Sequence, residues 1–133
     1  MAIMLPQDIH TYNAQLLREE GAICAVLAQY IITNLPEASS KVRHGHPVWF
    51  LQSNPVVGYS KQKNGICVLF RSGQSFHEVW LSHVGKFKAA QAVYTDVTKI
   101  DPNALRRWLE KAKNIQRDYK NIVARKGVLE RLV

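Results

Sequence analysis

The stretch from Lys41 to Ser72 most constrains the fold, because it alternates apolar and polar residues between closely spaced turn residues. It predicts three or four consecutive antiparallel strands, on which both long helical segments pack. Asn64-Gly65 is the strongest turn signal, since Asn and Gly readily adopt the positive φ angles of a type I′ hairpin turn. With these two residues as the loop, the predicted cross-strand pairs are Lys63 with Ile66, Lys61 with Val68, Tyr59 with Phe70 and Val57 with Ser72.

Alternation along these strands predicts which side chains share a face. A second turn at Ser53-Asn54-Pro55 joins residues 48–51 to residues 56–59. A loop of two or of four residues at this turn leaves the alternation unchanged. The predicted core face consists of Val48, Phe50, Val57, Tyr59, Ile66, Val68 and Phe70.

The opposite face of the predicted sheet collects Trp49, Leu51, Gly58, Ser60, Cys67, Leu69 and Arg71. This face is too apolar to be fully exposed to water, so a helix covers it, or it forms a subunit contact or the floor of a pocket. As a pocket it offers the indole of Trp49, aliphatic walls at Leu51 and Leu69, and an open floor at Gly58. Ser60 and Arg71 would supply polar groups that hold a ligand. The candidate ligand-binding residues are therefore Trp49, Leu51, Gly58, Ser60, Leu69 and Arg71, and an anionic or aromatic ligand fits them.

Two amphipathic helical segments flank this region. The first starts near Asp8 as N-cap, tolerates or breaks at Gly21, and ends before Pro36. Its second half places Ile23, Val26, Leu27, Tyr30 and Ile31 at helical spacing. The second begins at Asp101-Pro102, an N-cap followed by proline at the first helical position. Its apolar stripe is Leu105, Trp108, Leu109, Ala112, Ile115, Tyr119 and Ile122, with Gly127 as the C-terminal cap.

Shorter elements complete the prediction. Ser75 and Glu78 resemble a capping box for a short helix through Leu81, although this segment also fits an extended conformation. Residues 90–97 read as the last strand. The predicted fold class is α+β, an antiparallel β-meander of about five strands flanked by N-terminal and C-terminal helices. Residues 1–133 form one domain.

Charge and cysteine content narrow the function classes. The formal net charge is +8. Residues 99–133 carry ten Lys or Arg against four Asp or Glu, and residues 1–98 carry eight against six. This surplus fits an acidic protein partner or a nucleic acid, and it fits a solvated helix face equally well. The two cysteines have no metal-ligand spacing, and no signal peptide or membrane-spanning run is present. We therefore expect a cytoplasmic protein with free thiols and no membrane partner.

The order of motifs resembles a known family. A helix ending at Leu35-Pro36 is followed by residues 43–50, RHGHPVWF, then by a β-meander ending in residues 68–73, VLFRSG, and by the Asp101-Pro102 helix. This order resembles the YdhG-like bacterial domains, a mostly uncharacterised group, over roughly residues 20–118. The markers are Gly45, Pro47, Trp49-Phe50, Phe70, Gly73, Gly85-Lys86 and the helix end from Leu109 to Ala112. The resemblance implies an α+β fold with an antiparallel sheet between N- and C-terminal helices.

Some members of that family are described as frataxin-like intracellular iron chaperones. The residues predict no cofactor, and iron is possible by this family resemblance only. Frataxin-type iron binding relies on clustered carboxylates, because hard cations prefer oxygen ligands. This chain has ten Asp and Glu residues and no acidic ridge, and so departs from that pattern. His44 and His46 flank a glycine and would share a face in an extended segment, which makes them weak candidate metal ligands.

The sequence contains no nucleophile elbow, phosphate-binding loop, dinucleotide fingerprint or zinc-protease motif. We expect no catalysis. The predicted function is that of a small intracellular binding or carrier domain for a small anionic or aromatic ligand or for a protein partner. The alternatives are an iron chaperone of the frataxin-like type and a basic nucleic-acid-binding module. The sequence leaves open whether the protein is a monomer or a homodimer.

Overall fold

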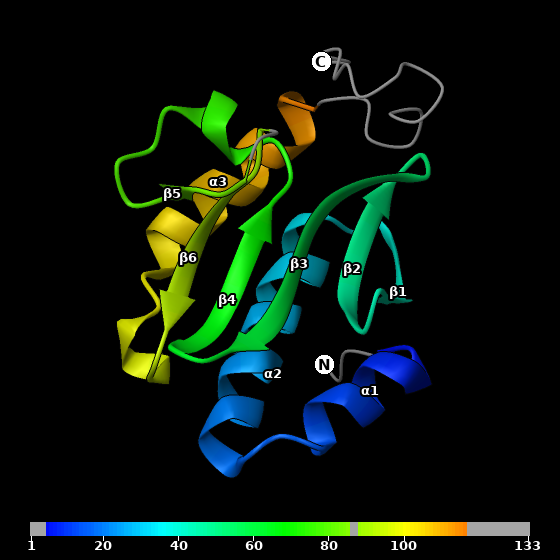
Figure 1. The fold of residues 1–133 in the computed structure, drawn as a ribbon. Helices are drawn as coiled ribbons and strands as arrows, with labels where there is room; N and C mark the ends of the chain where they lie inside the picture. Colours follow the sequence, from blue (N-terminus) through cyan, green and yellow to red (C-terminus); the bar gives the residue numbers. More distant parts are fainter. Residues whose placement is uncertain (1–4, 86–87, 117–133) are drawn as a thin grey trace.

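The computed structural model describes residues 5–85 and 88–116. Three helices pack on one face of a six-stranded antiparallel sheet (Figure 1). The helices are α1 (Gln7–Ala14), α2 (Arg18–Asn34) and α3 (Pro102–Asn114). The strands are β1 (Ser39–Arg43), β2 (His46–Leu51), β3 (Asn54–Gln62), β4 (Gly65–Phe70), β5 (Ser82–His83) and β6 (Ala90–Tyr94), in the spatial order β1-β2-β3-β4-β6-β5. Short 3₁₀ turns occupy Gly73–Phe76 (η1) and Val97–Lys99 (η2). The predicted α+β class and helix-flanked antiparallel sheet are confirmed.

The N-terminal helical region is two helices rather than one. α1 follows Pro6, and the Asp8 carboxylate in its first turn accepts a 2.7 Å hydrogen bond from the Val42 N–H of β1. Asp8 is therefore a first-turn residue rather than the N-cap: one carboxylate oxygen accepts from the Ile9 N–H of α1 at 2.8 Å, and the other satisfies a backbone donor of the edge strand. α2 begins after Leu17, whose N–H donates to the Glu20 side chain at 3.1 Å. Of its predicted apolar stripe, Ile23, Leu27 and Ile31 are buried, whereas Val26 and Tyr30 are partly buried. The helix ends ahead of Pro36, as predicted.

The β3–β4 hairpin pairs Val57 with Phe70 and Tyr59 with Val68, which differs by two residues from the predicted register. The loop consists of Lys63 and Asn64, and the positive φ of 139° falls on Gly65, so Asn64-Gly65 is not a type I′ loop. An even shift leaves the side-chain alternation intact. The five predicted core residues of this hairpin are accordingly all at most 1% exposed.

In β2, by contrast, the predicted faces are reversed. Leu51 pairs with Asn54 across a loop of Gln52 and Ser53, both with positive φ as in a type I′ turn. Phe50 then pairs with Pro55, but Trp49 pairs with Val57, so one extra β3 residue, Val56, forms a β-bulge. A one-residue shift moves every β2 side chain to the other face. Trp49 and Leu51 consequently face the helices, whereas Val48 and Phe50 lie on the opposite face.

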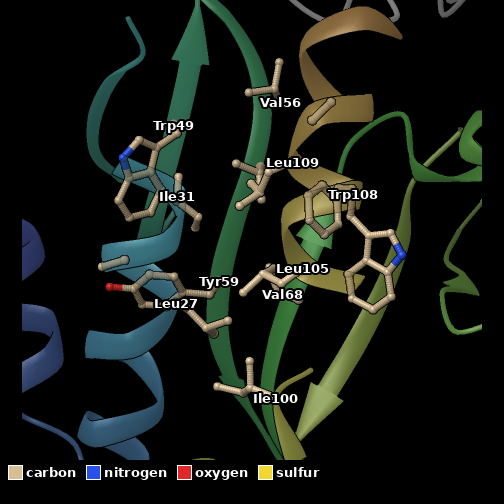
Figure 2. Close-up of a cluster of buried hydrophobic side chains, with 14 of the residues drawn as sticks. Leu27, Ile31, Trp49, Val56, Tyr59, Val68, Ile100, Leu105, Trp108 and Leu109 are labelled. Carbon is tan, nitrogen blue, oxygen red and sulfur yellow. The ribbon is translucent and has the colours of Figure 1, made fainter. Parts of the chain in front are cut away.

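The core lies between the helices and this sheet face (Figure 2). Aromatic side chains connect its parts: the ring centroids of Trp49 and Tyr59 are 5.7 Å apart, and those of Phe70 and Trp108 are 6.0 Å apart. Near 6 Å, tilted and edge-to-face ring pairs add to the stabilisation from buried area.

α3 starts as predicted, with the Asp101 carboxylate accepting hydrogen bonds from Asn103 and Ala104. It ends at Asn114, and Ile115 is extended, so the helix is shorter than the predicted stripe. The predicted helical positions Tyr119 and Ile122 and the cap Gly127 lie outside the described residues. The last strand is also shorter than predicted and ends at Tyr94. Among the described residues no helix is both long and apolar enough to cross a bilayer.

Candidate functional site

The site predicted on the second sheet face does not assemble as a whole. Trp49 is 1% exposed and packs with Tyr59 in the core, and Leu51 packs against the same cluster. Gly58 and Leu69 pair with each other on the opposite face, and Ser60 and Arg71 follow their alternation. Trp49 and Arg71, the central pair of the predicted site, are therefore on opposite sides of the sheet.

Gly58 is not an open floor for a ligand. A Cβ atom added there would lie 2.6 Å from the Pro47 carbonyl oxygen and 3.4 Å from the Val48 side chain. The space above Gly58 is thus filled by β2, and glycine is needed because the two strands approach closely.

What remains of the predicted site is a surface that we call the outer sheet face. It lies on the side of the sheet opposite the helices (Figure 1). By strand alternation and pairing it carries Lys41, Arg43, His46, Val48, Phe50, Gly58, Ser60, Cys67, Leu69 and Arg71. The Lys41 ammonium and the Arg43 guanidinium lie 5.5 Å and 5.6 Å from the centroid of the Phe50 ring. At this distance a cation is attracted to the ring face, so Phe50 positions both side chains.

The histidine pair has the geometry of a turn rather than of a metal centre. His44 and Gly45 form the β1–β2 loop with φ angles of 54° and 83°, and His46 Nδ1 lies 3.3 Å from the His44 carbonyl oxygen. Burial lowers the pKa of His46, and the nearby charge of Arg71 lowers it further. Within the described part of the chain, no three His, Cys, Asp or Glu side chains are grouped as a metal site would need.

Both thiols are poorly suited to nucleophilic chemistry. Cys24 and Cys67 are buried, and burial raises their pKa values to about 12 and about 11. A thiolate is the reactive form of cysteine, so both side chains stay protonated near neutral pH.

A second candidate site lies at the far edge of the sheet, where the segment from η1 to β5 is attached to α3. The Glu78 side chain, 7% exposed, accepts hydrogen bonds from Arg107 at 2.7 and 2.9 Å, from the Trp108 indole at 2.9 Å, and from Lys111. Lys111 also donates to the Phe76 carbonyl at 3.0 Å. The hydrogen bonds from Arg107, with those from Lys111 and Trp108, hold the pKa of Glu78 at about 2. Glu78 is thus a long-range attachment point rather than part of the predicted capping box.

The two residues after Glu78 project into solvent although they are large and apolar. Val79 is 90% exposed and Trp80 is 74% exposed. Trp80 lines a hollow of about 500 Å³ that also contacts β6 and the start of α3. We call it the Trp80 hollow; its lining is Asn64, Trp80, Ser82, Gln91, Ala92, Val93, Tyr94, Lys99, Asp101, Ala104 and Trp108.

The Trp80 hollow combines aromatic surface with hydrogen-bonding groups. Trp80, Tyr94 and Trp108 supply three rings, and amide, hydroxyl, ammonium and carboxylate groups lie among them. Burial and the Asp101 charge raise the pKa of Tyr94 to about 12, so its hydroxyl remains a donor. Sequence reasoning missed this site because its residues come from four separate segments between residues 64 and 108. The single local signal was a tryptophan in a segment with no clear periodicity.

The β5–β6 pairing explains why the hollow is open. β5 pairs only Ser82 with Gln91 and His83 with Ala90. The last residues of β6, Ala92 to Tyr94, therefore have β4 on one side and no paired strand on the other within the described chain. The side chain of Trp80 lies by this short edge instead of continuing the strand.

Comparison with solved structures places this arrangement among known folds. The crystal structure of YdhG from Bacillus subtilis, a protein of the DUF1801 family, aligns with a TM-score of 0.60 over 90% of this chain and 92% of that chain. This chain has a YdhG-like fold. The sequence identity is 11%, so the likeness concerns the fold and assigns no ligand. No family model matches the sequence, and no curated protein matches it significantly. The YdhG-like resemblance seen in the sequence is confirmed as a fold.

Proposed function

We propose that this YdhG-like domain is a non-catalytic binding protein whose site is the Trp80 hollow and whose ligand carries a flat aromatic group. The observation that supports this most is Trp80 itself, a side chain 74% exposed beside two further aromatic rings in a hollow of about 500 Å³. Small-molecule sites have volumes of this order and combine apolar walls with a few polar groups.

The attachment of Glu78 supports binding rather than incidental exposure of an apolar residue. Two residues before Trp80, the Glu78 carboxylate is held by three side chains of α3. This fixes the start of the segment that presents Trp80 to solvent. A ligand that stacks on a side chain so presented loses less conformational entropy than one that must order a mobile loop.

Of the two charged side chains that line the hollow, Lys99 can hold an anionic substituent on the ligand. The Asp101 carboxylate is engaged as the N-cap of α3, where it accepts from Asn103 and Ala104. Lys99 is exposed on the same lining and presents an ammonium group. An aromatic ring with a carboxylate or phosphate group would place the ring among Trp80, Tyr94 and Trp108 and its charge near Lys99.

The test is a thermal-shift screen with small aromatic anions, such as adenosine monophosphate, indole-3-acetate and benzoate, together with the uncharged tryptophan side-chain analogue indole. Ligands that bind the native state raise the melting temperature by mass action. Wild type is compared with Trp80→Ala, and Val79→Ala serves as the matched control because Val79 is still more exposed and does not line this hollow. Stabilisation that is lost in Trp80→Ala and kept in Val79→Ala is expected.

Two results would contradict the proposal. One is stabilisation of Trp80→Ala equal to that of wild type, which would move the ligand to another site. The other is the absence of any stabilisation of wild type by the whole set.

A further inference from the structure

The outer sheet face differs from the rest of the molecule in its charges. Strands β1 to β6 contain no Asp or Glu, but they contain Lys41, Arg43 and Lys61. Every Asp and Glu in the described ranges lies in a helix or a connection. Lys61 shares the helix side with Tyr59 and pairs with Glu20 of α2 at 3.3 Å, whereas Lys41 and Arg43 lie on the face opposite the helices. The strands contribute these cations and no carboxylate to that face, which favours a positive potential there.

Lys41 and Arg43 are the centre of this positive surface. They are two residues apart in β1, so both side chains point to the outer sheet face. The Phe50 ring beneath them holds both charges, at 5.5 Å and 5.6 Å from its centroid. Neither side chain takes part in a salt bridge with another described residue. Two positioned cations without an acidic neighbour on the face are suited to an anionic partner.

Arg71 extends the same surface beyond β4. Arg71 follows Phe70 and so points to the outer sheet face by alternation, as Lys41, Arg43 and His46 do on β1 and β2. Burial is the main cause of the lowered pKa of His46, and the charge of Arg71 adds to it. The positively charged side chains thus come from the first strand of the β1–β4 unit and from the residue that follows its last strand. The neutral side chains of Ser60 and Leu69 lie between them on the same face.

We propose that the outer sheet face binds single-stranded nucleic acid through its phosphates. A single strand presents negative charges at regular intervals, and apolar base faces can rest on the neutral residues between the cations. Phe50 is 5% exposed and already covered by Lys41 and Arg43, so it supports the cations rather than stacking on a base. Binding should consequently depend little on sequence.

Duplex DNA fits this surface less well. A duplex also offers phosphates, but its bases are paired and stacked inside, so their faces cannot rest on the neutral residues between the cations. Reading its groove would require a helix or a two-stranded ribbon that protrudes into it. The three described helices pack on the other face of the sheet (Figure 1). An acidic peptide shares the negative charge but lacks the flat base surfaces, and it is included in the test as the competing partner.

The experiment measures fluorescence anisotropy of labelled oligothymidylate of about 15 nucleotides with the full chain in about 50 mM salt. Contacts of Lys41 and Arg43 with two phosphates predict a slope of about −1.4 or steeper for the logarithm of the affinity against the logarithm of salt concentration. The variant Lys41→Ala/Arg43→Ala should bind at least about tenfold more weakly. The control Lys63→Ala/Arg106→Ala removes the same charge from exposed positions in a hairpin loop and on α3, and it should bind nearly as wild type.

Folding is checked by circular dichroism and thermal melting of both variants. Three results would overturn the proposal: no salt-dependent binding by folded wild type, equal loss in both double variants, or equally tight binding of a polyglutamate of matched charge or of duplex DNA. Equal loss would assign binding to net charge alone. Trp80→Ala should bind the oligonucleotide as tightly as wild type does, because Trp80 is not on the outer sheet face. The oligonucleotide assay therefore tests this inference independently of the proposed ligand binding in the Trp80 hollow.

Discussion

The attachment of Glu78 to α3 leads to the most direct quantitative prediction. In Glu78→Gln the side-chain oxygen can still accept from the Trp108 indole, but the negative charge that binds Arg107 and Lys111 is lost. The carboxylate pKa of about 2, against an ordinary value of 4.5, sets an upper limit of about 3.5 kcal/mol on the charge's contribution to the free energy of unfolding, since each tenfold change in acid dissociation is worth about 1.4 kcal/mol.

Solvent screening reduces this limit. The Arg107 and Lys111 side chains are 48% and 32% exposed, although Glu78 itself is 7% exposed. Exposed partners contribute less than buried ones, so we expect the substitution to lower the free energy of unfolding by about 1–2 kcal/mol at neutral pH. For a domain of this size that corresponds to a fall of roughly 3–10 °C in melting temperature.

The pH dependence has a defined sign. The folded-state pKa of Glu78 is depressed, so its contribution is fully present above the unfolded-state pKa near 4.5 and disappears as the pH falls toward about 2. Urea unfolding of wild type and Glu78→Gln at pH 7, 4 and 2.5 measures this, with Glu110→Gln as an exposed-carboxylate control. A difference between wild type and Glu78→Gln that stays constant down to the lowest pH would refute the role assigned to the charge. So would a loss as small as that of the control.

Three further predictions concern the sheet and the metal question. Gly58→Ala should lower the free energy of unfolding, measured in urea, by about 2–4 kcal/mol because the added methyl meets the Pro47 carbonyl. Gly45→Ala, where the space is open but φ is 83°, should lower it by only about 1 kcal/mol. Val68→Ala should lower the unfolding free energy by about 2 kcal/mol through a core cavity and Lys63→Ala by almost nothing; equal effects would contradict the observed faces of the hairpin. Titration calorimetry with ferrous ion should show no stoichiometric binding, because the chain has few carboxylates and a net charge of +8; a tight equimolar site would show that this expectation is wrong.

The predicted site residues show what strand alternation can and cannot predict about side-chain placement. Strand alternation correctly placed Gly58, Ser60, Leu69 and Arg71 on one face, but Trp49 and Leu51 were assigned to that face wrongly. Alternation has a period of two, so each bulge inverts everything beyond it, and a bulge next to Pro55 has no unique sequence signature.

By itself the sequence determined the α+β class, the YdhG-like fold, the core face of β3 and β4, and the Asp101-Pro102 start of α3. The strand faces and the helix start depend on interactions between residues near one another in the chain, and the fold was recognised from the order of motifs over roughly residues 20–118. A hairpin register error of two residues does not alter which side chains are buried. Only the tertiary structure decided that Glu78 would join α3, about 30 residues away, and leave Trp80 exposed beside a hollow. Such contacts arise because packing brings distant segments together, and the residue pattern of either segment alone does not predict which other segment it will contact.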